Sequence, residues 1–269
     1  MRKYILEISG IAVIAFSLLI SAYKNEHSAA ENKTSVKVIR IEDAYKHYAK
    51  QVYDSAHLNQ AGLTFTVFEK ALTGYYNLKK IGKVSENSLL TIADFDQSSR
   101  KKRLYIIDLK KEHVLLNTWV AHGQRSGEDT AVKFSNQNDS FSSSIGFYLT
   151  AEEYKGAHGR SLRLDGMDYG YNDNARLRSI VIHGASYVSE GTIEALGRLG
   201  RSQGCPAVAP ELSELVINTL GSGSVLYINK TDEEYHSKYL DEKVAAVYAS
   251  LPSNPQAGFS ENNYQHQFD

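Results

Sequence analysis

The stretch Arg201-Ser-Gln-Gly-Cys-Pro206 carries the only cysteine of the 269-residue chain. Gly204 and Pro206 flank Cys205 and predict a tight turn, and the side chains before them are polar or small. Such surroundings are not typical of a cysteine that is buried as an apolar residue. We therefore interpret Cys205 as a functional thiol.

A second stretch, Ser179-Ile-Val-Ile-His-Gly184, ends an apolar run on a histidine. The run predicts a short strand that is central in its sheet. A thiol of ordinary pKa is only a few per cent ionised at neutral pH, so a nucleophilic cysteine needs a base or a cation beside it. His183 can serve as either if this strand meets the cysteine turn, and a helix expected over 189–199 would return the chain between them.

The cysteine turn also suits acyl transfer, which needs backbone N–H groups aimed at the oxyanion of the tetrahedral intermediate. We expect the successive amides of Gln203, Gly204 and Cys205 to point to one spot, with Gly204 allowing a close backbone approach. Pro206 has no N–H, so the donors are expected at or before Cys205.

Composition and motif content exclude several classes of function. The formal net charge of −1 leaves no basic excess to neutralise phosphates, which argues against nucleic acid as the main partner. A single cysteine cannot form an intrachain disulfide. The sequence has no Walker loop, no dinucleotide fingerprint and no helical His-x-x-x-His pair, so we predict neither a cofactor nor a metal.

The N-terminus predicts export to the periplasm or cell envelope. A short basic start precedes an uncharged run from Ile8 to Ala22, and Ser28-Ala-Ala30 offers the small residues that a signal peptidase needs. Residues 1–30 are therefore predicted to be a signal peptide. An uncleaved anchor is the alternative, and it would be the protein's only contact with the membrane.

The rest of the chain divides into three predicted parts. Residues 31–87 are expected to form a linker and a helical leader. Residues 88–230 show period-two patterns and short apolar runs, which predict a catalytic domain that is mainly β with a few helices. Residues 231–269 are largely charged and polar, and we expect a loosely held tail. The predicted fold class is thus a mainly β domain preceded by a short helical segment.

Local signals place the helices. The leader contains one helical pattern over 41–58 and a second that starts at a Thr66-x-x-Glu69 capping box. Ser189 is expected to cap the helix that follows the His183 strand. Pro210 suits the first turn of a helix that ends before Gly221.

Two histidines and several arginines are candidates for contacts with a substrate. His122 and His158 each precede a glycine in a predicted loop, and each either lines a groove or lies on the surface. Arg160 and Arg201 belong to a group of arginines around the cysteine turn, which suits a substrate with carboxylates or a solvated face with ordinary ion pairs. The polar stretch 124–144 is long for a connection and predicts a lid or a rim loop.

The segments around His183 and Cys205 resemble the YkuD-type L,D-transpeptidase catalytic domain, in the divergent branch of murein L,D-transpeptidase catalytic domain proteins. The resemblance covers residues 66–229. Further stretches in the style of that branch are Gly74-Tyr-Tyr-Asn-Leu78, Val120-Ala-His-Gly123, Phe134-Ser-Asn136, Ser144-Ile-Gly-Phe-Tyr148, Ser161-Leu-Arg-Leu-Asp-Gly166 and Asn172-Asp-Asn-Ala-Arg176.

The resemblance implies a β-rich fold with the cysteine in a groove under a mobile flap. It implies that Cys205 is the nucleophile and His183 the base, that Ser202 opens the motif, and that the Gly184 carbonyl orients the imidazole. The implied substrate is a peptidoglycan stem peptide, which loses a terminal D-alanine to form a thioester on cysteine and is then attacked by the amine of a neighbouring diaminopimelate. Gln203 departs from the family pattern, which usually has histidine at this position.

Two alternatives stay open at this point. Water could accept the acyl group at the same site, which would make the protein an L,D-carboxypeptidase. A protein with a decayed site would be a non-catalytic cell-wall-binding protein, although the presence of both Cys205 and His183 in the motif argues against that.

Overall fold

The computed structural model describes residues 40–232 and 234–251, so the predicted signal segment over residues 1–30 lies outside the described part. The strands are β1 (Leu89–Asp94), β2 (Leu104–Asp108), β3 (His113–Thr118), β4 (Gly146–Gly156), β5 (Gly159–Gly166), β6 (Val181–Gly184), β7 (Ala207–Val208) and β8 (Val225–Asn229). The helices are α2 (Ile41–Ser55), α3 (Phe65–Lys80), α4 (Glu190–Leu196), α5 (Pro210–Leu220), the 3₁₀ helix η1 (Lys238–Leu240) and α6 (Glu242–Ala249).

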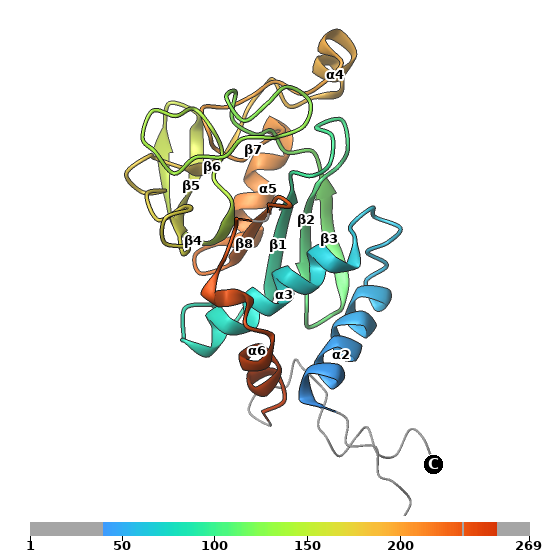
Figure 1. Ribbon diagram of the computed structural model, residues 1–269. Helices are drawn as coiled ribbons and strands as arrows, with labels where there is room; N and C mark the ends of the chain where they lie inside the picture. The colour runs from blue at the N-terminus through green and yellow to red at the C-terminus, as the bar shows by residue number, and fades with distance from the viewer. Residues whose placement is uncertain (1–39, 233, 252–269) are drawn as a thin grey trace, which may run out of the picture. The chain divides into compact units, whose positions relative to one another are not determined.

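The eight strands form one mixed sheet in the order β3-β2-β1-β8-β4-β5-β6-β7 (Figure 1). Most neighbouring strands are antiparallel, while β1 pairs with β8, and β6 with β7, in parallel. None of the helices in the described ranges is long and apolar enough to cross a membrane. The prediction of a sheet-rich fold preceded by a helical segment is confirmed.

Strand β6, which carries His183, lies beside the edge strand β7 and is not central in the sheet, so this prediction was wrong. Its apolar residues are buried for a different reason. Helix α5 packs against β6, and Ile182 shares an apolar core with Val216 and Ile217 of that helix. A covering helix therefore explains the apolar run that suggested a central strand.

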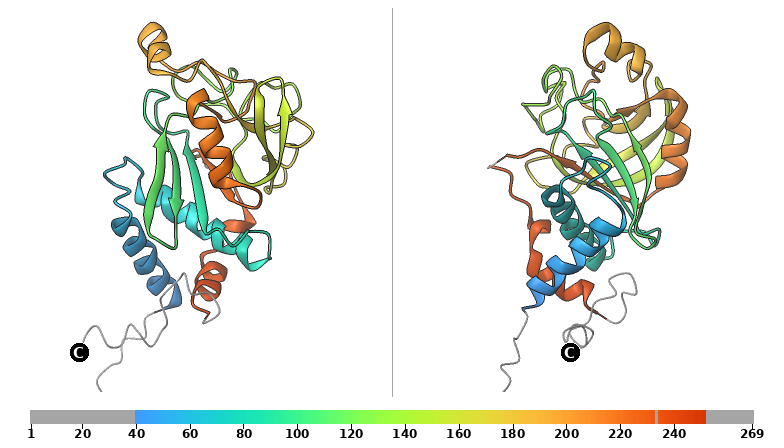
Figure 2. Two further views of the ribbon diagram at one scale, coloured as in Figure 1. Left: turned by 180° about the vertical axis from the view of Figure 1, so that it is seen from behind. Right: turned by 90° about the vertical axis from the view of Figure 1, so that its right-hand side faces the viewer.

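Helices α3 and α5 cover opposite faces of the sheet (Figure 2, right). Helix α3 packs against β1 and β8, and α2 and α6 pack in turn on α3. Gly74 of α3 lies directly against the Phe147 ring, since a Cβ added there would be 2.0 Å from ring carbons. Of the leader helices, α3 thus packs on the sheet and α2 packs on α3, as expected of packing elements.

The predicted helix caps agree with the structure in part. Ser189 accepts a hydrogen bond from the Thr192 amide, and Pro210 begins α5, both as predicted. The capping box at Thr66 is wrong, because α3 already begins at Phe65 and its N-cap residue makes no side-chain cap bond.

The chain beyond Thr231 is held more firmly than the polar composition suggested. Asn77 Nδ2 donates to the carbonyl oxygens of Tyr239 and Asp241, each at 2.9 Å. The buried Asp168 carboxylate accepts from Tyr235 Oη at 2.7 Å. Three alanines of α6 are buried, so a short apolar patch fixes this segment as far as residue 251. The predicted loose tail is therefore corrected for residues 234–251, and the other domain boundaries stay predictions.

Candidate active site

Strands β6 and β7 bring the two predicted site segments together. His183 pairs with Ala207 in the parallel register, and two positions earlier the Val181 amide donates to Cys205 Sγ at 3.5 Å. Cys205 and His183 both line a pocket of about 470 Å³. The predicted meeting of the histidine strand with the cysteine turn therefore occurs at this end of the sheet.

His183 is buried, and its ring is held from two sides. Nδ1 lies 2.9 Å from the carbonyl oxygen of Gly184, and because a carbonyl can only accept, Nδ1 carries the proton. The neutral ring then leaves Nε2 as an acceptor. Burial lowers the pKa of His183 below its ordinary value, the Gly184 carbonyl opposes that shift, and nearby His158 lowers the pKa further. These causes favour the neutral form, which is the form that can accept a proton.

The Cys205 thiol lies in an environment that favours its protonated form. Burial raises its pKa, while the Val181 amide and the positive charge of Arg178 act in the opposite direction. Its sulfur lies 3.7 Å from the Ser179 carbonyl, to which the S–H group donates. Among the described residues, the hydrogen-bond partners of Sγ are thus the backbone groups of Val181 and Ser179, and His183 is not one of them.

The cysteine turn is closed by Ser202. Its hydroxyl donates to the Cys205 carbonyl at 2.6 Å and accepts from the Gly204 amide at 3.0 Å. The Gly204 amide is therefore occupied, which corrects the expectation that it points with its neighbours to one oxyanion. Within the described ranges, the amides of Gln203 and Cys205 donate to no other residue.

Position 204 requires glycine for a different reason. Its φ of +125° lies in the region that residues with a side chain avoid, and an added Cβ would be 2.8 Å from the Ser142 carbonyl oxygen. Ser143 completes this contact, because its hydroxyl donates to the Gly204 carbonyl at 3.1 Å. The loop over 124–144 thus packs directly on the cysteine turn.

That loop also contributes to the pocket, as expected of a rim. Asp139 and Phe141 line it and have positive φ values, as does Ser179, which also lines the pocket. Residues with side chains adopt this conformation at a cost of about 1–3 kcal/mol, and such strain clusters at functional sites. Movement of the loop as a lid stays a prediction.

Arg178 is the site residue that the sequence did not distinguish from the neighbouring arginines. It lines the pocket, and its Nη1 donates to Ser135 O at 2.6 Å and Ser144 Oγ at 3.0 Å. Its Nη2 donates to Ser140 Oγ at 3.1 Å and Ser142 O at 2.5 Å. Arg178 therefore fixes the rim loop and places a positive charge near the thiol.

Of the four residues predicted to contact the substrate, two line the pocket and two do not. Arg201 and His158 line the pocket, and the His158 ring stacks on His183 with 4.2 Å between centroids. Arg160 does not line it and pairs instead with Glu153 and Glu214. Gln203 lines the pocket and is exposed.

His122, like Arg160, does not line the pocket. It is buried, its Nδ1 accepts from Arg103 at 2.7 Å, and its Nε2–H donates to the Gly127 carbonyl at 3.3 Å. Burial and the Arg103 charge lower its pKa to about 4. The expectation that His122 lines a groove is therefore corrected: it holds the backbone behind the site. In the described part of the chain, no cluster of metal-ligating side chains is present.

Comparison with known proteins assigns the chain to a family. Residues 59–229 match the family model of the L,D-transpeptidase catalytic domain, and the chain belongs to that family. No curated protein matches the sequence significantly.

Several solved structures are similar at low identity. An L,D-transpeptidase from Mycobacterium smegmatis is 12% identical with a TM-score of 0.34, over 53% of this chain and 59% of that one. One from Mycobacterium tuberculosis H37Rv is 15% identical with a TM-score of 0.32, over 53% and 58%. The helical cell shape determining protein Pgp2 from Campylobacter jejuni is 14% identical with a TM-score of 0.34, over 66% and 63%. The chain thus spans about three fifths of the length of these structures, and its assignment rests on the family match.

Proposed function

We propose that the protein is a cysteine acyltransferase that cross-links peptidoglycan stem peptides by L,D-transpeptidation, in the periplasm or cell envelope. Membership of the L,D-transpeptidase catalytic domain family supports the reaction class. The observation that carries the proposal is that one pocket is lined by both Cys205 and His183, the pair expected from the sequence. The exported location rests on the N-terminal sequence alone.

In the first half of the proposed reaction, His183 Nε2 takes the proton of the Cys205 thiol. The Nδ1–H bond to Gly184 leaves Nε2 unprotonated for this role. The thiol is hydrogen-bonded to the backbone of Val181 and Ser179, so we expect its side chain to turn toward His183 when substrate binds. The thiolate attacks the carbonyl carbon that precedes the terminal D-alanine, and a tetrahedral oxyanion forms.

The oxyanion needs donors that the fold does not already use. The amides of Cys205 and Gln203 meet this condition among the described residues, whereas the Gly204 amide is bound to Ser202. As the intermediate collapses, the C–N bond breaks and the D-alanine amine leaves with the proton from the His183 imidazolium. A thioester between Cys205 and the donor peptide remains.

In the second half, an acceptor amine attacks the thioester carbonyl. His183 takes the amine proton, a new peptide bond forms, and the Cys205 thiolate leaves and is reprotonated. If water takes the place of the amine, the same residues perform L,D-carboxypeptidase hydrolysis.

The decisive test is to incubate the protein with disaccharide-tetrapeptide and analyse the products by mass spectrometry, alongside Cys205→Ala. We expect cross-linked dimers that lack one D-alanine, and a loss of about 10⁴-fold or more in Cys205→Ala. Release of tripeptide without dimers would instead support the hydrolase. Equal absence of product from both proteins would overturn both enzymatic functions and leave the wall-binding alternative.

A further inference from the structure

Two arginines and one carboxylate line the pocket, so its fixed charges favour an anionic ligand. The arginines are Arg178 and Arg201, and the carboxylate belongs to Asp139. Both terminal nitrogens of Arg178 donate to oxygens of the rim loop, which leaves it little capacity to bind a ligand. Arg201 is different.

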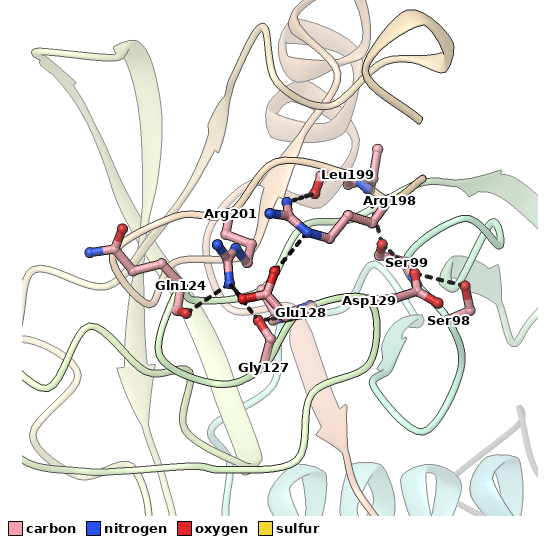
Figure 3. Close-up of polar contacts among 10 residues, drawn as sticks. Ser98, Ser99, Gln124, Gly127, Glu128, Asp129, Arg198, Leu199 and Arg201 are labelled. Carbon is pink, nitrogen blue, oxygen red and sulfur yellow. Dashed lines mark hydrogen bonds and ion pairs between the residues drawn. The ribbon is translucent and has the colours of Figure 1, made fainter. Parts of the chain in front are cut away.

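Every hydrogen bond of the Arg201 side chain to the described residues is made by a single nitrogen, Nη1 (Figure 3). Nη1 donates to the Gln124 carbonyl at 3.2 Å, the Gly127 carbonyl at 3.0 Å and Glu128 Oε1 at 2.7 Å. Its Nε and Nη2 have no partner within the described ranges, although the side chain is only 21% exposed. A half-buried arginine therefore presents an unused Nε–Nη2 edge.

The position of this guanidinium is set in advance by buried groups. The Gly127 carbonyl accepts hydrogen bonds from both Arg201 Nη1 and His122 Nε2. The other ring nitrogen of His122 accepts a hydrogen bond from Arg103, which is fully buried. Glu128, whose side chain is 72% exposed, pairs with both Arg201 and Arg198. A prepositioned arginine loses little freedom when it binds a ligand.

From this geometry we infer that Arg201 binds a carboxylate of the peptide substrate, through the two parallel N–H groups on Nε and Nη2. This edge has the geometry that pairs with both oxygens of one carboxylate. The inference rests on the proposed function for the identity of the substrate, a stem peptide with free carboxylates. It also assigns a role to His122, which positions Arg201 through Gly127 and does not contact the substrate itself.

The test measures binding separately from turnover. The full chain with Cys205→Ala is titrated calorimetrically with disaccharide-tetrapeptide, and with two analogues in which either the terminal carboxylate or the diaminopimelate carboxylate is a carboxamide. We expect one amidation to raise the Kd about tenfold or more, because a charge-assisted pair is lost. In Arg201→Gln, the Kd of the unmodified tetrapeptide should rise by about tenfold or more. The amidation that weakens binding to the Cys205→Ala protein should then change the Kd by less than about threefold.

Arg198→Gln is the matched control, because Arg198 shares Glu128 with Arg201 and does not line the pocket. It should retain the discrimination between acid and amide. Arg201→Lys separates loss of the two-nitrogen edge from misfolding, since a lysine can donate to the same carbonyls but lacks that edge. This variant should lose most of the discrimination between acid and amide while its unfolding temperature is unchanged. A general defect would weaken acid and amide binding equally.

The inference is overturned if neither amidation changes the Kd, or if Arg201→Gln weakens acid and amide alike. It is also overturned if no peptide binds. Failure of the proposed function has a different signature, because peptides would then bind with the acid-over-amide preference while the unsubstituted enzyme releases no D-alanine.

Discussion

The two halves of the sheet are built from different interactions. In the inner half, β1, β2, β8 and the first part of β4 are buried along their length and held by apolar contacts such as the stack of Phe147 on Tyr227, with 4.5 Å between ring centroids. At the site edge, which we define as β6, β7 and the turn 201–206, the strand residues Ile182 and Val208 belong to the apolar core, but the turn itself is held by the buried hydroxyls of Ser202 and Ser143. Stability and reactivity are therefore expected to depend on separate residues.

The strongest contrast compares Phe147→Ala with Cys205→Ala. The Phe147 ring is fully buried and packs on Tyr227, Tyr239 and α3, so its removal should cost about 3–5 kcal/mol of unfolding free energy. Folded Phe147→Ala should retain its turnover. Cys205→Ala should abolish turnover and lower the unfolding free energy much less than Phe147→Ala, because the thiol is small and its hydrogen bonds are weak, although it packs against the core.

Urea unfolding and product formation at a temperature where both variants are folded measure these effects. A large loss of turnover per folded molecule in Phe147→Ala, or strong destabilisation by Cys205→Ala, would contradict the division of the sheet into two regions.

The same division explains which features could be predicted from the sequence. Strand and helix positions follow from local periodicity and caps, as at β8 and α5. The pairing of His183 with Cys205 follows from two short motifs. The role of Arg178 depends on four loop oxygens 34 to 43 positions away, and no local pattern distinguishes it from Arg176, which pairs with Glu152 and Asp165.

Burial of polar groups was the other unpredictable feature. His122 looked like a surface or groove residue, yet Arg103 and the Gly127 carbonyl satisfy both ring nitrogens in the interior. Tyr235 and Asn77 fix the C-terminal segment through contacts with Asp168, Tyr239 and Asp241 that span long sequence distances. A composition-based prediction treats these polar side chains as exposed, because it has no information about their partners.

A pair of glycine substitutions sharpens the comparison at the site edge. Gly204→Ala places a Cβ 2.8 Å from a backbone oxygen at a φ of +125°, so we expect a loss of about 1–3 kcal/mol and a marked loss of activity. Gly197→Ala is the matched control: its φ is +69°, and an added Cβ there meets nothing within 4 Å. It should cost about 1 kcal/mol, the strain of the backbone alone.

Thermal unfolding and turnover of the two variants separate contact from strain. Equal effects of the two substitutions on both measurements would mean that the contact between the cysteine turn and Ser142 has no role.

The smallest effect is expected from His158, whose ring stacks on His183. His183 must be neutral to accept the thiol proton, so activity should fall as pH drops through its pKa, which lies below the ordinary value. The stacked His158 ring contributes to that lowering by its charge and by covering His183. His158→Ala removes both causes, so the pKa of His183 should rise and the acid limb of kcat/KM should move to higher pH.

His158→Phe keeps the cover without a second imidazole, so its acid limb should shift in the same direction but less. The pKa of His183 can be followed directly by NMR titration of its ring protons in each variant. An unchanged or lowered pKa in His158→Ala would show that the hairpin tip between β4 and β5 does not tune the base. The pKa of His183 is therefore expected to be highest in His158→Ala, intermediate in His158→Phe and lowest in the unsubstituted protein, because only the stacked histidine combines cover with charge.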